Sequence, residues 1–452
     1  MARPYRICVI SLGCPKNLVD AEVMCGTLAS AGFQLTDDRD AADLLLINTC
    51  SFIKDARTEA DDEILQALRW KRRGRGRRKV AVAGCLPQRA PAETAQAYPE
   101  VDLFLSLDDV PRAAQLVRGL RDADNPDHAA RNVPAGLLPT YLYDHTAPRL
   151  TLTPASYAYV KIAEGCDHRC AYCSIPAIRG RQRSRPIASV LEECRQLLGQ
   201  GAGELDLIAQ DTSRYGLDRD DGAGLAELVR EIDTLPGDFW VRVLYTHPRY
   251  VTEPLIDALA ASPHVVPYLD IPLQHISDPV LKAMRRGLGG RDTRTLMERL
   301  RERWPGVAVR TTFLVGFPGE TEADFEQLLQ YVTEYRFDRL GVFAYSPEAG
   351  TPAAEITEGC VPPAVAAARR DAIMARQQDL ATEANRALIG RTLRVIADRE
   401  EHPGRYLGRS AADAPDIDNV VHFRGPRGGI DGHFANVRID KATPYDLTGT
   451  AV

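Results

Sequence analysis

The sequence predicts an α/β protein built from three parts, and three observations support this fold class. Residues 6–120 alternate short apolar runs with amphipathic stretches, which is the pattern of a parallel sheet covered by helices. Six further strand-and-helix repeats follow from residue 157 onward, and after residue 391 short β-like runs alternate with Gly, Pro and Asp turns. We therefore expect an N-terminal parallel-sheet domain (residues 1–121), a linker (122–153), a central partial (β/α)6 TIM-like barrel (154–385) and a small all-β barrel (386–452).

The N-terminal part is predicted to be a small sheet with helices packed on it. The strand-like runs are residues 7–12, 44–48 and 80–83, the helical patterns are residues 18–31 and 54–73, and Pro91 and Pro111 suit the first turns of two more helices. Residues 121–153 are rich in Asp, Asn, Pro and Ala and show no sustained period, so they are predicted to form a linker.

The central part is predicted to be an open barrel. Its candidate strands are residues 157–163, 205–209, 241–245, 266–271, 307–315 and 339–344. Six such units exceed the mononucleotide-binding half of a doubly wound fold and fall short of the eight units of a full TIM barrel. A helical segment at 362–388 then leads to β-like runs at 393–397, 420–423 and 435–439, which fit a small barrel.

Composition narrows the class of protein. Hydrophobic residues make up 44% and charged residues 26%, and no apolar run approaches the roughly 20 residues that a membrane span needs. The N-terminal residues lack the features of a signal peptide, so we expect a cytoplasmic protein without a membrane partner. Ten cysteines in a reducing compartment favour metal or redox chemistry over disulfides.

Three of these cysteines, Cys166, Cys170 and Cys173, form a CxxxCxxC motif just after the first barrel strand. Catalytic residues of barrel folds lie at that end of the strands. Three thiolates on a cubane cluster leave one iron open for substrate. Zinc instead prefers four protein ligands, and near these three cysteines only His168 could be the fourth. The motif therefore favours an iron-sulfur cluster over a zinc site.

A second set, Cys14, Cys50 and Cys85, follows three N-terminal strands that are far apart in sequence. The carboxyl ends of parallel strands share one edge of a sheet, so these thiols could converge, although buried cysteines packed as small apolar residues would look the same. The packing interpretation is accepted for the remaining four cysteines, which are Cys8, Cys25, Cys194 and Cys360.

The CxxxCxxC motif, with Tyr172 before the last cysteine, resembles the signature of the radical S-adenosylmethionine (SAM) superfamily. The resemblance implies a 4Fe-4S cluster on Cys166, Cys170 and Cys173. It implies that SAM chelates the open iron and is cleaved by one electron to methionine and a 5′-deoxyadenosyl radical, which abstracts a hydrogen atom from carbon. It also implies an electron donor such as flavodoxin or ferredoxin.

The sequence Ser-Leu-Gly-Cys-Pro-Lys-Asn-Leu-Val-Asp-Ala-Glu at residues 11–22, with Asn-Thr-Cys-Ser-Phe at 48–52 and Ala-Gly-Cys-Leu-Pro at 83–87, resembles the N-terminal domain of methylthiotransferases. This resemblance covers nearly the whole chain. It implies a second 4Fe-4S cluster on Cys14, Cys50 and Cys85 and a C-terminal β-barrel called TRAM. In the family the second cluster carries the sulfur, which is methylated by one SAM and transferred to the carbon radical generated by another.

Two branches of that family differ in substrate. Cys-Pro-Lys-Asn at residues 14–17 resembles the branch that modifies the β-carbon of an aspartate in the twelfth small-subunit ribosomal protein. The tRNA branch, which modifies isopentenylated adenosine, typically has Cys-Gln-Met-Asn there. Residues 268–278 and 408–418 resemble the ribosomal-protein branch, apart from Ala411, where relatives carry an aromatic residue. A tRNA methylthiotransferase stays the nearest alternative, and a two-cluster electron carrier or a non-catalytic ribosome-associated factor are the others.

Charge distribution bears on the partner. Residues 391–452 carry nine Lys or Arg and nine Asp or Glu, whereas an RNA-binding module is usually basic. Asp413, Asp416 and Asp418 are expected either to favour a basic protein surface or to form a solvated acidic loop. One basic stretch, residues 71–79, could contact ribosomal RNA, although such runs are more often solvated loops. Its arginines are Arg72, Arg73, Arg75, Arg77 and Arg78.

SAM would be held at the barrel rim where strands two to five end. The candidates, each of which could instead serve loop structure or core packing, are Gln210, Asp211, Thr246, His247, Gln274, His275, Gly316, Phe317 and Gly319. The glycines would permit the backbone to approach an adenosine closely.

Overall fold

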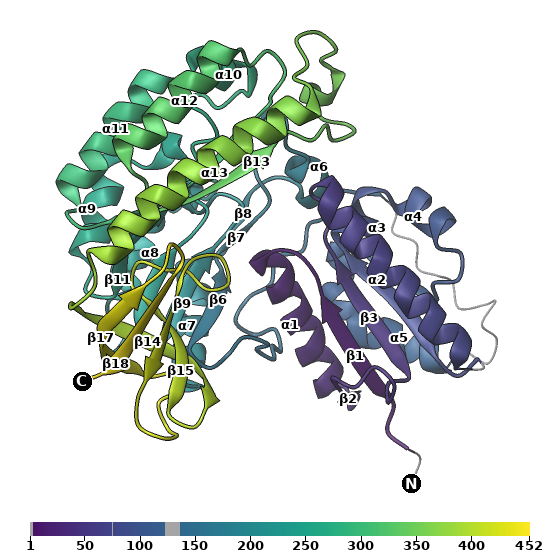
Figure 1. The fold of residues 1–452 in the computed structure, drawn as a ribbon. Helices are drawn as coiled ribbons and strands as arrows, with labels where there is room; N and C mark the ends of the chain where they lie inside the picture. Colours follow the sequence, from purple (N-terminus) through teal and green to yellow (C-terminus); the bar gives the residue numbers. More distant parts are fainter. Residues whose placement is uncertain (1–2, 75, 123–135) are drawn as a thin grey trace. The chain divides into compact units, whose positions relative to one another are not determined.

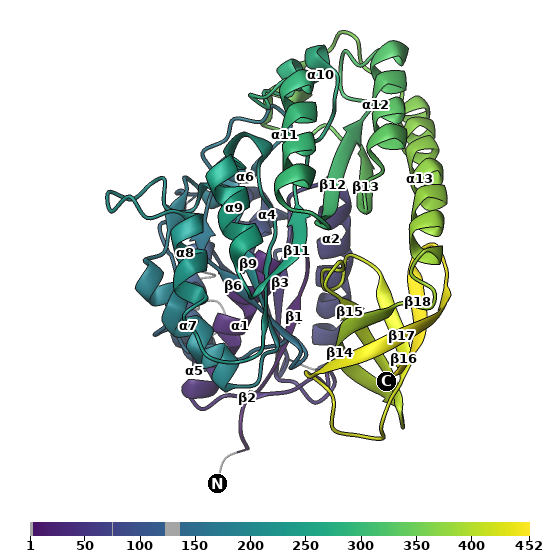
Figure 2. The same ribbon diagram turned by 90° about the vertical axis from the view of Figure 1, so that its left-hand side faces the viewer.

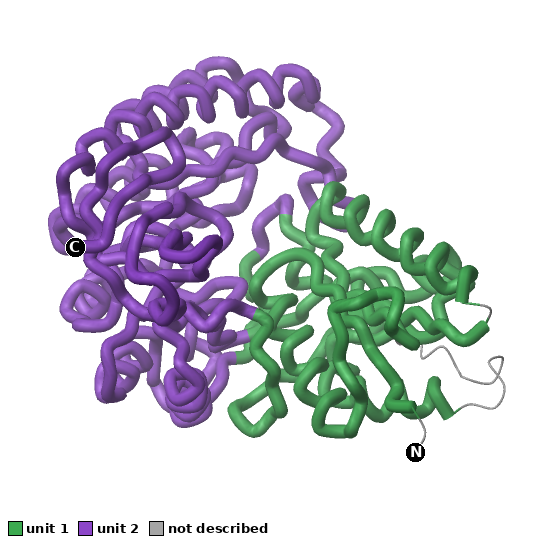
Figure 3. The backbone as a smooth tube through the Cα atoms, turned by 60° about the horizontal axis from the view of Figure 1, so that its bottom comes forward, with its two compact units in different colours: residues 1–152, 164–168, 173–183 green, residues 153–163, 169–172, 184–452 purple. Residues whose placement is uncertain are grey.

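The computed structural model describes residues 3–74, 76–122 and 136–452, so residues 123–135 of the predicted linker lie outside the described residues. The chain divides into two compact units (Figure 3). Unit 1 comprises residues 1–152, 164–168 and 173–183, and unit 2 comprises residues 153–163, 169–172 and 184–452. The CxxxCxxC loop therefore contributes residues to both units.

Unit 1 contains a parallel five-stranded sheet in the order β2-β1-β3-β4-β5 (Figure 1). Its strands are β1 (Arg6–Ser11), β2 (Gln34–Leu35), β3 (Leu44–Thr49), β4 (Lys79–Gly84) and β5 (Leu103–Leu105). The three predicted strands are confirmed and occupy the centre of the sheet. The edge strands β2 and β5 were not predicted, because two or three residues are too short to show an apolar period.

Helices cover both faces of this sheet. The helices of unit 1 are α1 (Pro15–Ser30), α2 (Lys54–Arg73), α3 (Cys85–Arg89), α4 (Pro91–Ala97), the 3-10 helix η1 (Leu107–Arg112), α5 (Ala113–Asp122) and α6 (Ile175–Arg179). Helix α2 packs its apolar stripe, including Ile64 and Trp70, against Ile47 and Val82, while α1 contacts α5. Pro91 begins α4 as predicted, but Pro111 lies inside η1 and the following helix begins at Ala113.

Unit 2 contains a parallel six-stranded sheet in the order β13-β12-β11-β10-β9-β6. Its strands are β6 (Tyr157–Lys161), β9 (Glu204–Ile208), β10 (Trp240–Val243), β11 (Val265–Asp270), β12 (Ala308–Val315) and β13 (Arg339–Ala344). These are the six predicted strands, in chain order across the sheet, and β6 and β13 form its open edges. A short pair, β7 (Ala163–Glu164) and β8 (Arg183–Ser184), was not predicted.

Helices of unit 2 pack against the six-stranded sheet, and α13 continues from it to the C-terminal barrel (Figure 2). They are α7 (Ile187–Gly199), α8 (Leu225–Ile232), α9 (Glu253–Ala261), α10 (Asp278–Ala283), α11 (Gly290–Arg303), α12 (Glu322–Tyr335) and α13 (Pro363–Arg386), with 3-10 turns η2 (Thr212–Arg214), η3 (Pro248–Tyr250) and η4 (Pro352–Glu355). Among the described residues, no helix combines the length and apolar character that crossing a bilayer requires.

The C-terminal barrel is closed, with strand order β14-β15-β16-β18-β17. Its strands are β14 (Thr392–His402), β15 (Arg405–Ser410), β16 (Val420–Arg424), β17 (Phe434–Ala442) and β18 (Asp446–Ala451). Apolar residues on alternate positions, such as Val395, Val437 and Ile439, fill its interior. The strands β15 and β18 were not predicted, because glycine and polar residues interrupt their apolar alternation.

Buried ion pairs join the barrel to the six-stranded sheet within unit 2. Glu204 of β9 accepts hydrogen bonds at 2.6 Å from Arg242 of β10 and at 2.6 Å from Arg409 of β15. Arg409 also donates to Asp398 at 2.9 Å. Charged groups in a low-dielectric interior are tolerated only when they are paired in this way.

Two aspartates of the acidic loop after β15, Asp413 and Asp418, face inward, so the expectations that they favour a basic partner surface or form a solvated loop are wrong for these two, whereas Asp416 is exposed. Asp413 pairs with Arg339 at 2.5 Å, and Asp418 pairs with Arg310 at 3.3 Å. The loop is acidic because it neutralises arginines of the six-stranded sheet. Asp416 accepts a hydrogen bond at 2.9 Å from the Tyr157 hydroxyl in the same interface. The backbone oxygen of Ala411 accepts from Arg242.

Asp206 should make stability depend on pH. Burial and the neighbouring Glu204 carboxylate raise the pKa of Asp206 well above its usual value. Arg242 does not offset this rise, because it lies 3.7 Å from Asp206 and already pairs with Glu204. Folding then takes up a proton at pH values between the unfolded and folded pKa, so this group lowers stability as the pH rises through that window. The Asp206→Asn variant, which mimics the protonated form, should gain up to about 1.4 kcal/mol per pH unit relative to the parent.

Urea unfolding at pH 5, 6, 7 and 8 measures this difference. The Asp238→Asn variant is the control, because the Asp238 side chain is 74% exposed. Its curve should run parallel to that of the parent protein, and a parallel curve for Asp206→Asn would contradict the assignment.

Candidate active site

The three N-terminal cysteines follow three neighbouring strands of the unit 1 sheet. Cys14 comes after β1, Cys50 directly after β3 and Cys85 directly after β4. Cys50 and Cys85 are buried, and Cys14 is half-buried. A Cβ atom added to Gly13 would lie 2.5 Å from the Cβ of Cys50 and 3.1 Å from its sulfur. The parallel topology therefore brings the loops of Cys14 and Cys50 into contact.

Asn17, the last residue of the Cys-Pro-Lys-Asn motif, ties these two loops together. Its amide nitrogen donates to the backbone oxygens of Leu12 at 2.7 Å and of Asn48 at 3.3 Å. Asn48 in turn donates to the backbone oxygen of Asn17 at 2.7 Å. Pro15 begins α1 directly after Cys14, where a missing N–H costs nothing. The motif thus sets the backbone course on both sides of Cys14.

The loops of Cys50 and Cys85 are also joined by hydrogen bonds. The Ser51 hydroxyl donates to the backbone oxygen of Cys85 at 2.9 Å, and the Thr49 hydroxyl donates to that of Ala83 at 2.6 Å. The Leu86 N–H donates back to the Thr49 hydroxyl at 3.3 Å. Hydrogen bonds therefore connect the loops that carry all three cysteines.

The electrostatics of the three thiols differ. Burial opposes ionisation of Cys14, but Lys16 and Arg179 outweigh it and lower its pKa. Burial raises the pKa of Cys85 to about 12 against the opposing effect of Arg179, and burial together with Cys14 raises the pKa of Cys50. The thiols therefore influence one another's ionisation, and a metal that bound them as thiolates would displace protons.

Gly13 should be intolerant of a side chain. Its φ of +85° is unfavourable for other residues, and a Cβ would clash with Cys50. We expect Gly13→Ala to lose about 1–2 kcal/mol of stability from the backbone alone and to lose the iron of the N-terminal cysteines after reconstitution. Iron analysis and urea unfolding measure the two effects.

Gly32→Ala is the matched control, because Gly32 has a φ of +86° and a Cβ there would meet nothing within 4 Å. It should lose comparable stability and keep its iron. Equal iron contents in the two variants would contradict the proposed close contact.

The CxxxCxxC loop is held by backbone contacts in each unit. In unit 1, the Cys166 N–H donates to the backbone oxygen of Gly180 at 3.0 Å. In unit 2, the Ala171 N–H donates to Met284 at 3.0 Å. Cys166 and Cys170 are buried, and Cys173 is half-buried. The loop therefore has a defined course around its cysteines.

Arg286 is a residue of this region that the sequence analysis missed. Its guanidinium donates to the Cys170 sulfur at 3.5 Å, to the Tyr172 hydroxyl at 3.4 Å and to the backbone oxygen of Pro272 at 2.7 Å. The residue lies in the loop between α10 and α11 and is only 6% exposed. Its position more than 100 residues from the motif left no local sequence signal.

The predicted SAM-binding residues lie at strand ends of unit 2, as expected for the rim. Asp211 accepts from the Ser213 hydroxyl at 2.5 Å, and the Thr246 hydroxyl donates to the backbone oxygen of Asp270 at 2.6 Å. Gln210 precedes Asp211 at the end of β9. A role of Gln210, Asp211 and Thr246 in SAM binding stays a prediction.

Three further rim candidates, Gln274, Gly316 and Phe317, lie in two turns. Gln274 has a φ of +72° and bridges to β12, with its N–H donating to Thr312 at 2.8 Å. Gly316 has a φ of +76°, and Phe317 is fully buried beside Tyr172, with ring centroids 6.5 Å apart. Phe317 is thus placed to support the loop of Cys170 by packing.

The two rim histidines and Gly319 make local contacts. His275 is fully buried, its Nδ1 accepts from the Ser277 N–H at 3.0 Å, and burial lowers its pKa to about 4. His247 accepts from the Arg249 N–H at 3.2 Å. The Gly319 N–H donates to the backbone oxygen of Gly359 at 2.8 Å.

No group of three or more His, Cys, Asp or Glu side chains within residues 3–74, 76–122 and 136–452 is arranged to hold a metal ion. An iron-sulfur cluster distributes its thiolates over separate irons, so its ligands lie farther apart than those of one ion. The ligand role of the six cysteines accordingly stays a prediction that rests on their number, position and chemistry.

The predicted RNA-contact stretch is partly neutralised. Lys71 pairs with Asp102 at 2.7 Å, and Arg78 pairs with Asp40 at 3.2 Å. Arg75 lies outside the described residues. Ion pairing within the chain leaves less positive charge for a phosphate backbone than the sequence alone indicates.

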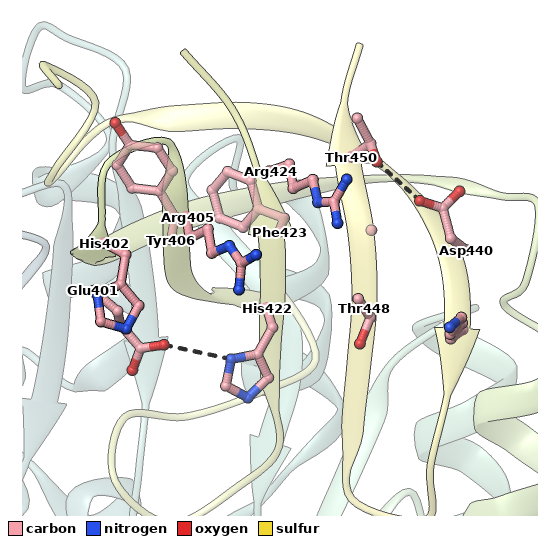
Figure 4. Close-up of a pocket in the computed structure, with 12 residues that line it drawn as sticks. Glu401, His402, Arg405, Tyr406, His422, Phe423, Arg424, Asp440, Thr448 and Thr450 are labelled. Atoms are coloured by element: carbon pink, nitrogen blue, oxygen red, sulfur yellow. Dashed lines mark hydrogen bonds and ion pairs between the residues drawn. The ribbon is translucent and has the colours of Figure 1, made fainter. Parts of the chain in front are cut away.

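A hollow of about 440 Å³ lies on the wall of the C-terminal barrel (Figure 4). Its ionisable residues are Glu401, His402, Arg405, His422, Arg424, Asp440 and Lys441. Glu401 faces His422 at 3.7 Å, and Asp440 accepts from the Thr450 hydroxyl at 2.9 Å. The hollow has three positively charged side chains (Arg405, Arg424 and Lys441) and two carboxylates (Glu401 and Asp440), so its net positive charge is small.

Comparison with family models divides the chain into three matched segments. Residues 6–106 match an uncharacterized protein family, UPF0004, residues 160–332 match the radical SAM superfamily, and residues 389–452 match the TRAM domain. The parallel six-stranded sheet with its CxxxCxxC loop is thus similar to the radical SAM superfamily, and the closed C-terminal barrel is similar to the TRAM domain.

Curated relatives resolve the branch of that class. The ribosomal protein uS12 methylthiotransferase RimO of Heliobacterium modesticaldum is 46% identical over 99% of this chain and 95% of its own length. The RimO proteins of Pelobacter propionicus and Geobacter sulfurreducens are each 44% identical, over 98% and 99% of this chain and 97% and 98% of their own lengths. The chain belongs to the RimO family of ribosomal protein uS12 methylthiotransferases.

Solved structures share the fold at low sequence identity. The radical SAM methyltransferase TsrM from Kitasatospora setae has a TM-score of 0.56 at 18% identity and covers 78% of this chain and 75% of its own. The cobalamin-dependent SAM radical enzyme OxsB has a TM-score of 0.53 at 12% identity and covers 82% of this chain and 56% of its own.

Proposed function

We propose that this enzyme attaches a methylthio group to the β-carbon of an aspartate in ribosomal protein uS12. The observation that carries the proposal is the presence of two three-cysteine sets, one following three parallel strands of unit 1 and the other in the loop after the first strand of the six-stranded sheet. Cys166, Cys170 and Cys173 would hold the radical SAM cluster, and Cys14, Cys50 and Cys85 would hold a second 4Fe-4S cluster. The names of the relatives and the Cys-Pro-Lys-Asn motif support uS12 as the substrate.

The residues present fit two clusters with open irons. Thiolates are soft ligands suited to iron-sulfur clusters, and each set supplies three rather than four. When bound, the clusters would supply an electron for cleavage of SAM and a sulfur atom for transfer. The protein's own part is to hold the thiols in place, as the bonds of Asn17, Ser51 and Thr49 do in unit 1.

Charged and aromatic side chains of the protein lie next to the cysteines of each unit. Lys16 and Arg179 favour the thiolate form of Cys14, and Arg286 donates to the sulfur of Cys170. Phe317 packs against Tyr172 of that loop, and the two rings would keep water away from a reactive radical. Gln210, Asp211, Thr246, Gln274, Gly316 and Phe317 are the residues that we propose for SAM binding at the rim.

We infer a small electron carrier, such as flavodoxin or ferredoxin, as the physiological reductant, since reductive cleavage of SAM needs one electron from outside. Cytoplasmic uS12, free or on the ribosome, would be the protein partner. Contact of the basic stretch at residues 71–79 with ribosomal RNA stays a prediction, and the internal ion pairs of Lys71 and Arg78 weaken it.

Mass spectrometry after anaerobic reconstitution with iron and sulfide tests the proposal. The enzyme is incubated with SAM and reductant and with either uS12 or tRNA. A methylthio mass gain on one aspartate of uS12 is the expected result. The same gain on tRNA adenosine instead would reassign the substrate, and cleavage of SAM with neither product would refute methylthio transfer to these substrates.

A further inference from the structure

Arg179 is a buried arginine of unit 1 whose guanidinium reaches one of the N-terminal cysteines. It ends α6 and is 1% exposed. Its Nη1 donates to both Glu164 oxygens at 3.0 Å, and both Nη atoms lie 3.1 Å from Asp20 Oδ2. Its Nη2 also lies 3.2 Å from Asn17 Oδ1 and 3.3 Å from Cys85 Sγ.

The two carboxylates explain why an arginine can be buried here, but they do not explain the sulfur contact. A buried guanidinium needs charged partners, and Asp20 and Glu164 supply them. A neutral thiol is a weak acceptor, so the Nη2–Sγ contact contributes little while Cys85 is protonated. A thiolate is a strong acceptor for a cationic donor. The contact therefore gains strength when Cys85 is ionised, as a cluster ligand must be.

The same guanidinium links Cys85 to the other loops of the set. Asn17, which ties the Cys14 and Cys50 loops together, presents its amide oxygen to Nη2 at 3.2 Å. Arg179 is thus in contact with one cysteine and with the residue that orders the other two loops.

We propose that Arg179 is a positioning residue for the second cluster. Arg179 fixes the Cys85 thiolate, and its charged hydrogen bond raises the reduction potential of the cluster. This inference rests on the proposed role of Cys14, Cys50 and Cys85 as cluster ligands. A cation and a hydrogen bond at a ligand sulfur stabilise the state with the extra electron, so the reduced cluster becomes easier to form. A merely structural clasp would not change the potential.

The test uses the full chain with Cys166, Cys170 and Cys173 replaced by alanine, so that iron binds only at the second set. Arg179→Lys and Arg179→Met are introduced into this parent. Arg149→Met is the matched control, since Arg149 is a buried arginine of the same unit that pairs at 2.6 Å with Glu22, also on α1. Iron content and an anaerobic potentiometric titration followed by electron paramagnetic resonance are measured for each protein.

We expect Arg179→Met to shift the midpoint potential to more negative values, Arg179→Lys to shift it less, and Arg149→Met to leave it at the parent value. A midpoint of Arg179→Met equal to that of Arg149→Met overturns the inference. If Arg179→Met holds no iron while Arg149→Met does, the positioning role is supported. The effect on the reduction potential is then tested with Arg179→Lys, and a midpoint equal to that of the parent would overturn that effect. A parent that binds no iron would instead refute the proposed ligand set itself.

Discussion

Replacement of Cys166 by alanine is expected to abolish both cleavage of SAM and methylthio transfer. The proposed radical SAM cluster has only three protein ligands, so the loss of one leaves two thiolates for four irons. Cys14→Ala should behave differently, because Cys14 belongs to the other set. It should retain formation of 5′-deoxyadenosine and lose the methylthiolated product.

Chromatography of 5′-deoxyadenosine and mass spectrometry of uS12 measure the two activities separately. Cys194→Ala is the control, since Cys194 is fully buried in the core of unit 2 and belongs to neither set. It should lose some stability from the small cavity and retain both activities. Retention of 5′-deoxyadenosine formation in Cys166→Ala would contradict the ligand assignment.

Replacement of Arg409 by methionine is expected to destabilise unit 2 by about 3–5 kcal/mol, because it leaves the half-buried carboxylate of Asp398 without its arginine and removes one of the two arginines that pair with the buried carboxylate of Glu204. The Arg409 and Glu204 side chains are at most 2% exposed. Urea unfolding at pH 7 measures the loss. A second effect should be loss of protection of the C-terminal barrel in hydrogen exchange, since this pair joins the barrel to β9.

Arg394→Met provides the contrast on the same barrel. Arg394 also pairs with an acid of the central part, Asp238, but the two side chains are 43% and 74% exposed. Exposed pairs contribute at most about 1 kcal/mol. Equal losses in the two variants would show that burial of the Glu204 pair does not decide its contribution.

Much of the fold was predictable because its central strands are long enough to show their pattern. All six strands of the unit 2 sheet and the three central strands of unit 1 match predicted apolar runs. The strands that were missed are edge strands of two or three residues, as in β2 and β5, or barrel strands interrupted by glycine, as in β15 and β18. Their pairing depends on neighbours in space, which no local window contains.

The acidic loop after β15 shows the limit of reasoning from charge. Three aspartates in six residues suggested a solvated or partner-binding surface. The arginines that neutralise Asp413 and Asp418 come from β13 and β12, more than 70 residues earlier. Sequence reveals the charges of a segment but not which distant groups satisfy them.

The sequence by itself determined the class of this protein and the six cysteines proposed to hold its clusters, because a cysteine motif, its spacing and its position after a strand are local properties. Only the tertiary structure decided which other groups surround them. Arg179 and Arg286 are single residues in unremarkable helix and loop segments, and they reach Cys85 and Cys170 only after the chain has folded. Packing of the whole core brings each of these cationic side chains to its buried sulfur, and no local stretch of the sequence specifies that packing.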